Sequence, residues 1–328
     1  MLKSSVLLLL LLISTFSAAC RGGQGLPFLQ ESRTPSVPSA LSRVAIVIDK
    51  NFTLNQDMNF TGNGMVISGD NITIDLGGHT IRGPGKGPWI WPEPALSSVG
   101  IEVKGRSNVV VKNGRIENFA TAIFLADSGK ITIENITTQL NHYGIYMYET
   151  RESTISQNQI TSNIYGLTTL GADNNLIIKN HVFRNHHFSP GGYGINLIAS
   201  FQNVIKENLV EDNMTQGIWL IKAGRNTIYH NNVSGNNPNG EDQGGANNWY
   251  EPKLKQGNYW GDYEGRDLNG DGIGDTPYQL FSERVVEDPY PIMKPKEWLQ
   301  SNLLTARFVV PESELGFILA VQASFSSP

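Results

Sequence analysis

The middle of the chain is built from a short internal repeat. Strings led by glycine, such as Gly144-Ile-Tyr-Met and Gly166-Leu-Thr-Thr, recur there. From Gly100 onward their first residues lie 22, 22, 22, 28 and 23 positions apart, and Ala122 replaces glycine once. A second string follows each one and ends in asparagine, and a third closes the unit. Such a constant phase is typical of stacked repeats, and it constrains the fold more than any other feature of the sequence.

Three short strands in each unit of 22 residues predict an all-β fold, a single-stranded right-handed parallel β-helix. We expect about seven or more coils with a cap at each end, each strand pairing with its copy about 4.8 Å away. Hairpins would not keep this phase, and a propeller would repeat at about 40 residues. The residues expected to form the inward ladders are Ile101, Ile123, Ile145, Leu167, Ile195 and Ile218, with Val103, Leu125, Met147, Thr169, Leu197 and Leu220.

Asparagine is concentrated in the repeat region. The chain has 31 asparagines, none before residue 51, and only Asn302 lies beyond residue 269. Asparagine tolerates the left-handed backbone conformation better than other non-glycine residues. We therefore expect the recurring asparagines to occupy left-handed corners and to hydrogen-bond to one another from coil to coil.

The N-terminus has the features of a secretory signal. Lys3 precedes eight aliphatic residues, Val6–Ile13, and small residues follow up to Cys20, the only cysteine. The position of Cys20 resembles a bacterial lipoprotein cleavage box, which predicts lipidation of Cys20 and membrane anchoring. Ordinary secretion with cleavage near Ala19 is the alternative.

A formal net charge of −5 argues against a nucleic-acid partner.

Changes in composition and phase predict six segments. They are a signal peptide at 1–20, a flexible tether at 21–42, an N-terminal cap with the first coil and a Trp-containing insert at 43–99, the β-helix coils at 100–237, a C-terminal cap with an Asp-rich loop at 238–295, and a tail at 296–328.

Two segments outside the coils identify a family resemblance. Asp70-Asn-Ile-Thr-Ile-Asp-Leu-Gly-Gly-His-Thr-Ile81 precedes the coils, and an aromatic segment that begins Gly257-Asn-Tyr-Trp-Gly-Asp-Tyr263 and continues to Tyr278 follows them. With the repeat, they resemble the NosD-like family of periplasmic accessory proteins in copper-enzyme maturation. The repeat is also similar to that of carbohydrate-binding proteins and sugar hydrolases. The resemblance implies a role near copper, and fold alone does not fix activity.

The Asp-rich loop has the spacing of a calcium ligand set. Asp267, Asn269, Asp271 and Asp275 stand at loop positions 1, 3, 5 and 9, and the Ile273 carbonyl is at position 7. Hard oxygen ligands at this spacing suit a structural Ca²⁺ ion. An Asx-rich turn without metal is the alternative, because Tyr278 stands where an EF-hand has glutamate.

Two insertions share one phase of the repeat and predict a groove. The first contains Trp89 and Trp91, and the second contains His186, His187 and Phe188. Both follow the third strand, so they should project from the same corner. The aromatic and histidine side chains expected between them are Phe124, His142, Tyr143, Tyr146 and Tyr165. Aromatic rings stack on sugar faces. This surface either binds a ligand or is simply covered by the two insertions.

Candidate groups for catalysis and for copper binding are scattered. Three carboxylates and one basic side chain lie nearest the expected groove, namely Glu102, Asp127, Glu149 and Arg151. A copper site would use His142, His186, His187 and Met214, of which His142 lies two coils from the others.

The sequence therefore predicts a monomeric protein outside the cytoplasm, in the periplasm or at the cell surface. Its expected function is non-catalytic binding of a surface polysaccharide, or that of an accessory scaffold in the maturation of an exported copper metalloenzyme. The alternative is a polysaccharide lyase, hydrolase or epimerase that acts in the groove.

Overall fold

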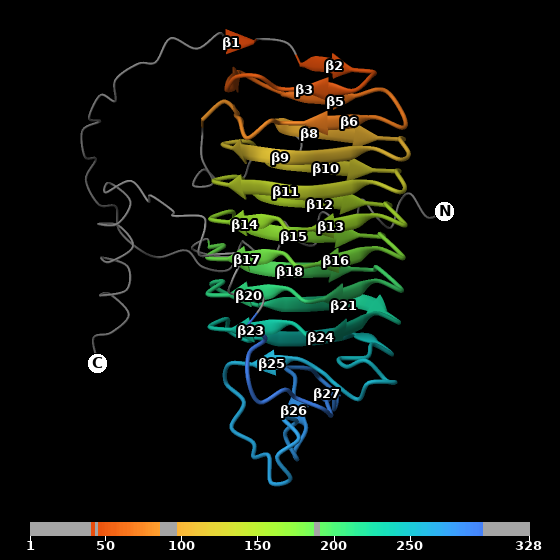
Figure 1. Cartoon of the computed structure of the whole chain (residues 1–328), viewed down its shortest axis with the longest axis vertical. Coiled ribbons are helices and arrows are strands. Elements are labelled where there is room, and N and C mark those ends of the chain that lie inside the picture. The colour runs from red at the N-terminus through yellow and green to blue at the C-terminus, as the bar shows by residue number, and fades with distance from the viewer. Residues whose placement is uncertain (1–40, 43–44, 86–96, 187–190, 298–328) are drawn as a thin grey trace, which may run out of the picture.

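The computed structural model describes residues 41–42, 45–85, 97–186 and 191–297. These residues form a parallel β-helix whose coils stack along the long axis of the molecule (Figure 1). The fold prediction is confirmed. Cys20, Trp89, Trp91, His187 and Phe188 lie outside the described residues.

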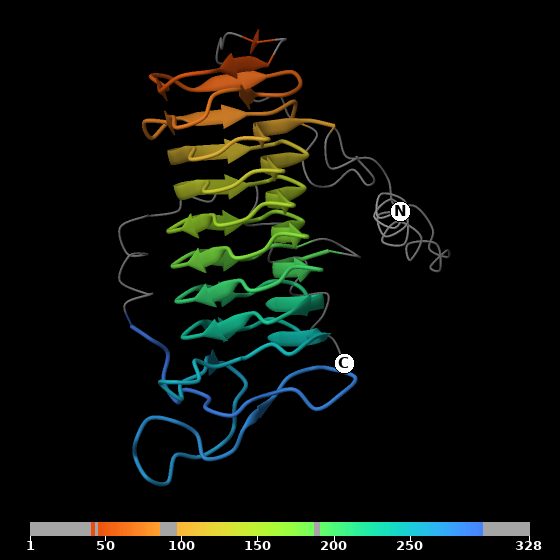
Figure 2. The ribbon, with the colours of Figure 1, turned by 90° about the vertical axis from the view of Figure 1, so that its right-hand side faces the viewer.

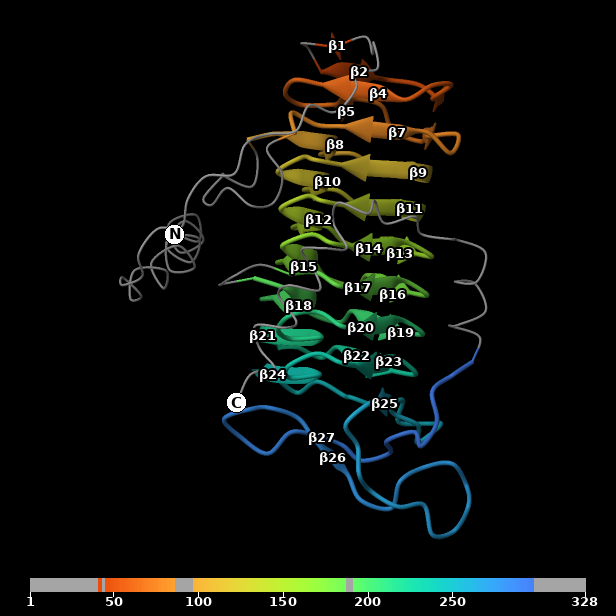
Figure 3. The same ribbon diagram turned by 90° about the vertical axis from the view of Figure 1, so that its left-hand side faces the viewer.

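One wall of the coil is a sheet of nine parallel strands in chain order. Its strands are β2 (Ile46–Ile48), β5 (Met65–Ile67), β8 (Val99–Lys104), β10 (Thr121–Ala126), β12 (Tyr143–Tyr148), β15 (Tyr165–Leu170), β18 (Tyr193–Ile198), β21 (Ile218–Gly224) and β24 (Gly240–Gly245). Figure 3 shows this sheet facing the second wall across the core.

The second wall is a sheet of sixteen strands that bends at a corner. Its strands are β1 (Leu41–Ser42), β3 (Phe52–Thr53), β4 (Met58–Phe60), β6 (Thr73–Asp75), β7 (Thr80–Arg82), β9 (Val110–Glu117), β11 (Thr132–Gln139), β13 (Thr154–Ser156), β14 (Gln159–Thr161), β16 (Leu176–Ile178), β17 (His181–Phe183), β19 (Val204–Lys206), β20 (Leu209–Glu211), β22 (Thr227–Tyr229), β23 (Asn232–Ser234) and β25 (Tyr259–Trp260). A short antiparallel pair, β26 (Tyr278–Gln279) and β27 (Glu287–Asp288), lies beyond the last coil (Figure 2).

The core consists of aliphatic ladders at the predicted positions. Ile101, Ile123 and Ile145 are register partners on β8, β10 and β12, and all three are fully buried. Glycine precedes these ladder positions on most coils because the coils approach closely there. A Cβ on Gly166 would lie 2.5 Å from the Gly194 carbonyl oxygen of the next coil.

Three ladders of buried asparagine mark the corners of the coils. Their members are Asn141, Asn163, Asn185, Asn213, Asn236 and Asn239; Asn158, Asn180, Asn208, Asn231 and Asn258; and Asn175, Asn203, Asn226 and Asn247. Within each ladder, one Nδ2 donates to the Oδ1 of the next coil, as from Asn158 to Asn180 at 2.9 Å. The prediction that the asparagines bond from coil to coil is confirmed.

The predicted backbone conformation is wrong for these ladders. Asn113, Asn118 and Asn135 do have positive φ, but the ladder asparagines do not. The residue before a ladder asparagine bends instead, as at Gln157 (φ 56°) and Lys179 (φ 56°). This bend turns the next side chain inward, where its amide also donates to a backbone carbonyl of the preceding coil, as from Asn158 to Ile133 at 2.9 Å.

Each ladder ends on a carboxylate in the C-terminal segment. Asn239 donates to Asp262 at 2.8 Å, Asn247 donates to Asp242 at 3.1 Å, and the Asn258 backbone N–H donates to Asp288 at 2.7 Å. An amide ladder with one polarity leaves donors at its last coil, and these aspartates accept their hydrogen bonds.

In the described part of the chain, no helix is long and apolar enough to cross a membrane.

Candidate ligand-binding surface

Aromatic side chains gather on the outer face of the nine-stranded sheet. Side chains alternate between inside and outside along a strand. The outward register partners on successive strands are Glu102, Phe124, Tyr146, Thr168, Asn196, Trp219 and Glu241. At the start of the strands, Tyr143, Tyr165 and Tyr193 form a second series of partners. Equivalent residues of neighbouring coils therefore lie side by side.

The rings form one continuous series of contacts, stacked in the middle and tilted at both ends, which we call the aromatic column. Its members are Phe124, Tyr146, Tyr143, Tyr165, Tyr193 and Trp219. Ring centroids are 4.6 Å apart between Tyr143 and Tyr165, and 5.0 Å apart between Tyr193 and Trp219. His142 stacks on Tyr143 at 5.0 Å. The aromatic column spans five strands, from β10 to β21.

The aromatic column is uncharged. Burial raises the pKa of Tyr146 to about 12, and burial also raises the pKa values of Tyr143, Tyr165 and Tyr193. All four phenols stay protonated at neutral pH. Phe124 and Tyr165 are buried within the column, whereas Tyr143, Tyr146, Tyr193 and Trp219 are half-buried. The half-buried rings combine apolar edges with protonated hydroxyls or an indole N–H, and such a combination suits sugars.

Two carboxylates lie in the outward series, which continues beyond Glu102 to Val66 and Val47. Glu102 lies next to Phe124 on β8, and Glu241 lies next to Trp219 on β24. Glu241 is buried and accepts a hydrogen bond of 2.7 Å from Gln216. Six strand spacings separate the two glutamates, which is about 29 Å. The surface is long enough for an extended polymer.

The structure brings together most of the predicted ligand-binding residues that it describes. Phe124, His142, Tyr143, Tyr146 and Tyr165 are in ring contact. His186 lies at the same corner, where its backbone N–H donates to the Asn163 carbonyl at 2.9 Å. Both insertions lie between a strand of the second wall and a strand of the nine-stranded sheet, namely β7 to β8 and β17 to β18.

Sequence reasoning missed two members of the aromatic column, Tyr193 and Trp219. A signal for both was present. Tyr193 precedes Gly194 as Tyr143 precedes Gly144, and Trp219 is the second residue after Gly217 in the recurring string. They were missed because the groove was expected between the two insertions, and both residues lie beyond the second insertion.

The candidate catalytic residues do not form one cluster. Glu102 is within β8, whereas Asp127, Glu149 and Arg151 lie in turns beyond the ends of β10 and β12. Asp127 and Glu149 both have positive φ at equivalent corners. A contact with Glu149 raises the pKa of Tyr148 at that corner. An acid and a base poised on opposite sides of one sugar bond are not evident in this arrangement.

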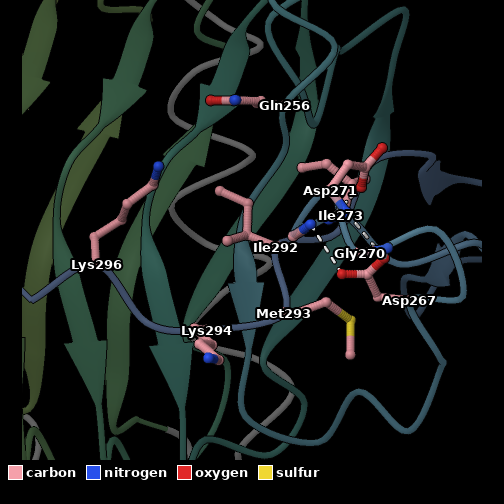
Figure 4. Close-up of a pocket in the computed structure, with 10 residues that line it drawn as sticks. Gln256, Asp267, Gly270, Asp271, Ile273, Ile292, Met293, Lys294 and Lys296 are labelled. Atoms are coloured by element: carbon pink, nitrogen blue, oxygen red, sulfur yellow. Dashed lines mark hydrogen bonds between the residues drawn. The ribbon is translucent and has the colours of Figure 1, made fainter.

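The Asp-rich loop borders a pocket of about 350 Å³ (Figure 4). Asp267 accepts backbone hydrogen bonds from Gly270 at 2.7 Å and Gly272 at 2.9 Å. Lys294 and Lys296 line the same pocket, and their positive charge disfavours a cation within it.

The calcium site stays a prediction. Asn269, Asp271, Ile273 and Asp275 lie in the loop as the spacing requires, and their polar groups bond within it. A calorimetric titration of the intact protein with Ca²⁺ tests it. The prediction requires binding that Asp267→Ala abolishes, and an absence of binding heat would contradict it.

The described residues do not assemble a copper ligand set. His142 is stacked on Tyr143 of the aromatic column, and Met214 is 44% exposed on the coil after His186. Within residues 45–85, 97–186 and 191–297, no group of three or more His, Cys, Asp or Glu is placed to hold a metal ion. Copper prefers several nitrogen or sulfur ligands at one point, and these residues do not fit it.

Comparison with known proteins places the chain in a family. Residues 56–265 match the family model described as "Periplasmic copper-binding protein (NosD)". A protein of Stutzerimonas stutzeri, named as a probable ABC transporter binding protein NosD, is 31% identical over 166 residues. That match covers 47% of this chain and 33% of the relative, so the chain spans about a third of the relative's length.

Solved structures share the fold at low identity. The DFA-IIIase of Arthrobacter chlorophenolicus A6 without its lid has a TM-score of 0.52 and 11% identity, covering 67% of this chain and 68% of that one. Its C387A mutant in complex with DFA-III has a TM-score of 0.50 and 10% identity, covering 80% and 76%. At these identities the likeness shows the fold alone.

Proposed function

Because the chain belongs to the NosD family of periplasmic β-helix proteins, we propose that it works outside the cytoplasm as a binding protein. Its ligand is a surface polysaccharide that lies along the aromatic column and is held without being cleaved. The observation that carries this proposal is the continuous ring stack from Phe124 to Trp219. The half-buried rings of Tyr143, Tyr146, Tyr193 and Trp219 provide apolar contact area at several positions along the column, as an extended polymer requires.

An assay for product release distinguishes this proposal from the enzymatic alternative. Glu102 lies apart from the other candidate carboxylates, which supports binding without turnover. Incubation with neutral and acidic polysaccharides should give retention of the protein and no new reducing ends or unsaturated products. Release of such products would instead support a lyase or hydrolase, and a change in sugar configuration would support an epimerase.

Replacing Trp219 with alanine should weaken polysaccharide binding about tenfold or more. The substitution removes the terminal ring of the aromatic column and its contact with Tyr193. Affinity electrophoresis in gels containing the polymer measures the change. Tyr229→Ala is the matched control, since Tyr229 points outward from β22 in the same coil but on the other wall. Equal losses in both variants would contradict the proposal.

A second candidate function follows from the family match. The protein would act as an accessory scaffold for an exported copper metalloenzyme, with the family membership of residues 56–265 in its favour. Co-purification of the intact protein with a copper enzyme from the native host tests this. Genes for a copper reductase and a transporter beside this one would support it.

A further inference from the structure

Four buried polar atoms lie close together on the outer side of the nine-stranded sheet. Thr168 Oγ1, Asn196 Oδ1, Gln216 Oε1 and Trp219 Nε1 are screened from solvent, and none has a hydrogen-bond partner among the residues that the structure describes. Each such atom costs free energy when it is buried without a partner. Four in one place are therefore an unusual concentration of unmet hydrogen-bonding capacity.

The register places these groups on adjacent strands. Thr168, Asn196 and Trp219 are direct partners on β15, β18 and β21. Thr168 is 5% exposed and Asn196 is 4% exposed. Gln216 stands just before β21 and orients its Nε2 toward Glu241, which leaves its Oε1 available. Because all of these side chains are outside the core ladders, a group that completes them must approach from outside the coil.

The chemistry of the cluster is neutral and includes both a donor and acceptors. The Trp219 N–H donates, the Asn196 and Gln216 oxygens accept, and the Thr168 hydroxyl does either. The only carboxylates in the outward series that contains them are Glu102 and Glu241. Lysine and arginine are absent from this series, whose residues are all described. Along this series an anionic sugar would meet like charge at Glu241 and no lysine or arginine.

We propose that Thr168, Asn196, Gln216 and Trp219 form a subsite that selects an uncharged sugar residue. This inference rests on the proposed polysaccharide-binding function and names its ligand class. A sugar hydroxyl or acetamido group accepts from Trp219 Nε1 and donates to the Asn196 or Gln216 oxygen. The neighbouring Tyr193 ring, which is stacked on Tyr165 and lies 5.0 Å from the Trp219 ring, borders the subsite.

Replacing Thr168 with valine tests the subsite with little change in shape. Binding of an N-acetylglucosamine hexamer or cellohexaose to the intact protein should weaken about 3- to 10-fold by calorimetry. The melting temperature should stay the same or rise, because the variant buries no unpaired hydroxyl. Thr154→Val, an outward threonine on the other wall, is the control and should change neither ligand affinity.

The possible results separate this inference from the proposed function. Tighter binding of polygalacturonate than of the neutral oligomers would overturn the neutral subsite and leave polysaccharide binding intact. Unchanged affinity in Thr168→Val would show that the hydroxyl does not contact the sugar, and a fall in melting temperature would show that it has a partner within the chain. Either result would overturn the subsite. Failure to bind any polymer, neutral or acidic, would overturn both proposals. Trp219→Phe, which keeps a ring and removes the N–H, should weaken neutral binding as Thr168→Val does.

Discussion

Replacing Asn180 with alanine should lower the free energy of unfolding by about 3–5 kcal/mol. Asn180 is buried in the middle of its ladder and takes part in bonds to both neighbouring coils. Its Oδ1 accepts from the Asn158 backbone N–H at 3.1 Å and side chain at 2.9 Å. Its Nδ2 donates to the Ile155 carbonyl at 2.8 Å and to Asn208 at 3.0 Å. Alanine would leave several buried groups without partners.

Urea denaturation followed by circular dichroism measures this loss. Asn135→Gly is the matched control, because Asn135 is an exposed corner residue with φ of 51°. Glycine accepts that conformation, so the control should lose less than about 1 kcal/mol. Similar losses at the two positions would mean that the buried ladder contributes no more than an exposed corner does.

Replacing Asp288 with asparagine should change how stability depends on pH. Burial raises the pKa of Asp288 to about 6, although Asn258, Trp260 and Tyr290 donate hydrogen bonds to its carboxylate. The folded protein therefore holds the Asp288 proton more tightly than the unfolded chain, whose carboxyl has a pKa near 3.8. The contribution of this group to stability is greatest at low pH and falls as the pH rises through the range from about 4 to 6.

The wild type should lose about 2 kcal/mol of unfolding free energy relative to Asp288→Asn between pH 4 and pH 7. Denaturant titrations of both proteins at unit steps of pH measure the difference. All other carboxyl groups are common to the two proteins, so their contributions cancel. A constant offset between the two curves would contradict the raised pKa and would leave only the effect of a lost hydrogen bond.

The inward ladders could be predicted from the sequence because they depend on the repeat alone. Once the phase of Ile101, Ile123 and Ile145 is recognised, parallel stacking fixes which side chains face the core. The asparagine ladders were predicted for the right positions but with the wrong backbone. The residue with the left-handed backbone conformation can be the asparagine itself or the residue before it. Sequence spacing does not distinguish these two cases. The chain bends at residues such as Gln157 and Lys179, so that the amide of the next residue points inward.

The candidate site was predictable only in part. The outward positions of Phe124 and Tyr146 followed from strand alternation. The membership of Tyr193 and Trp219 was not foreseen, because the groove was expected between the two insertions and both residues lie beyond the second one. The unpartnered atoms of Thr168 and Asn196 could not be foreseen, since hydrogen-bond satisfaction depends on every neighbouring group in three dimensions.

By itself, the sequence determined the solenoid, its aliphatic core and the asparagine corners, because a repeat with constant phase has one way to bury its apolar residues. The tertiary structure alone decided where the ladders end and what the outer face offers to a ligand. Asp242 lies on the last strand of the nine-stranded sheet, and Asp262 and Asp288 come from the segment after the coils. Only folding brings their carboxylates to the last donors of the three ladders. The neutral cluster beside the aromatic column likewise arises from residues of separate coils that the parallel register places next to one another.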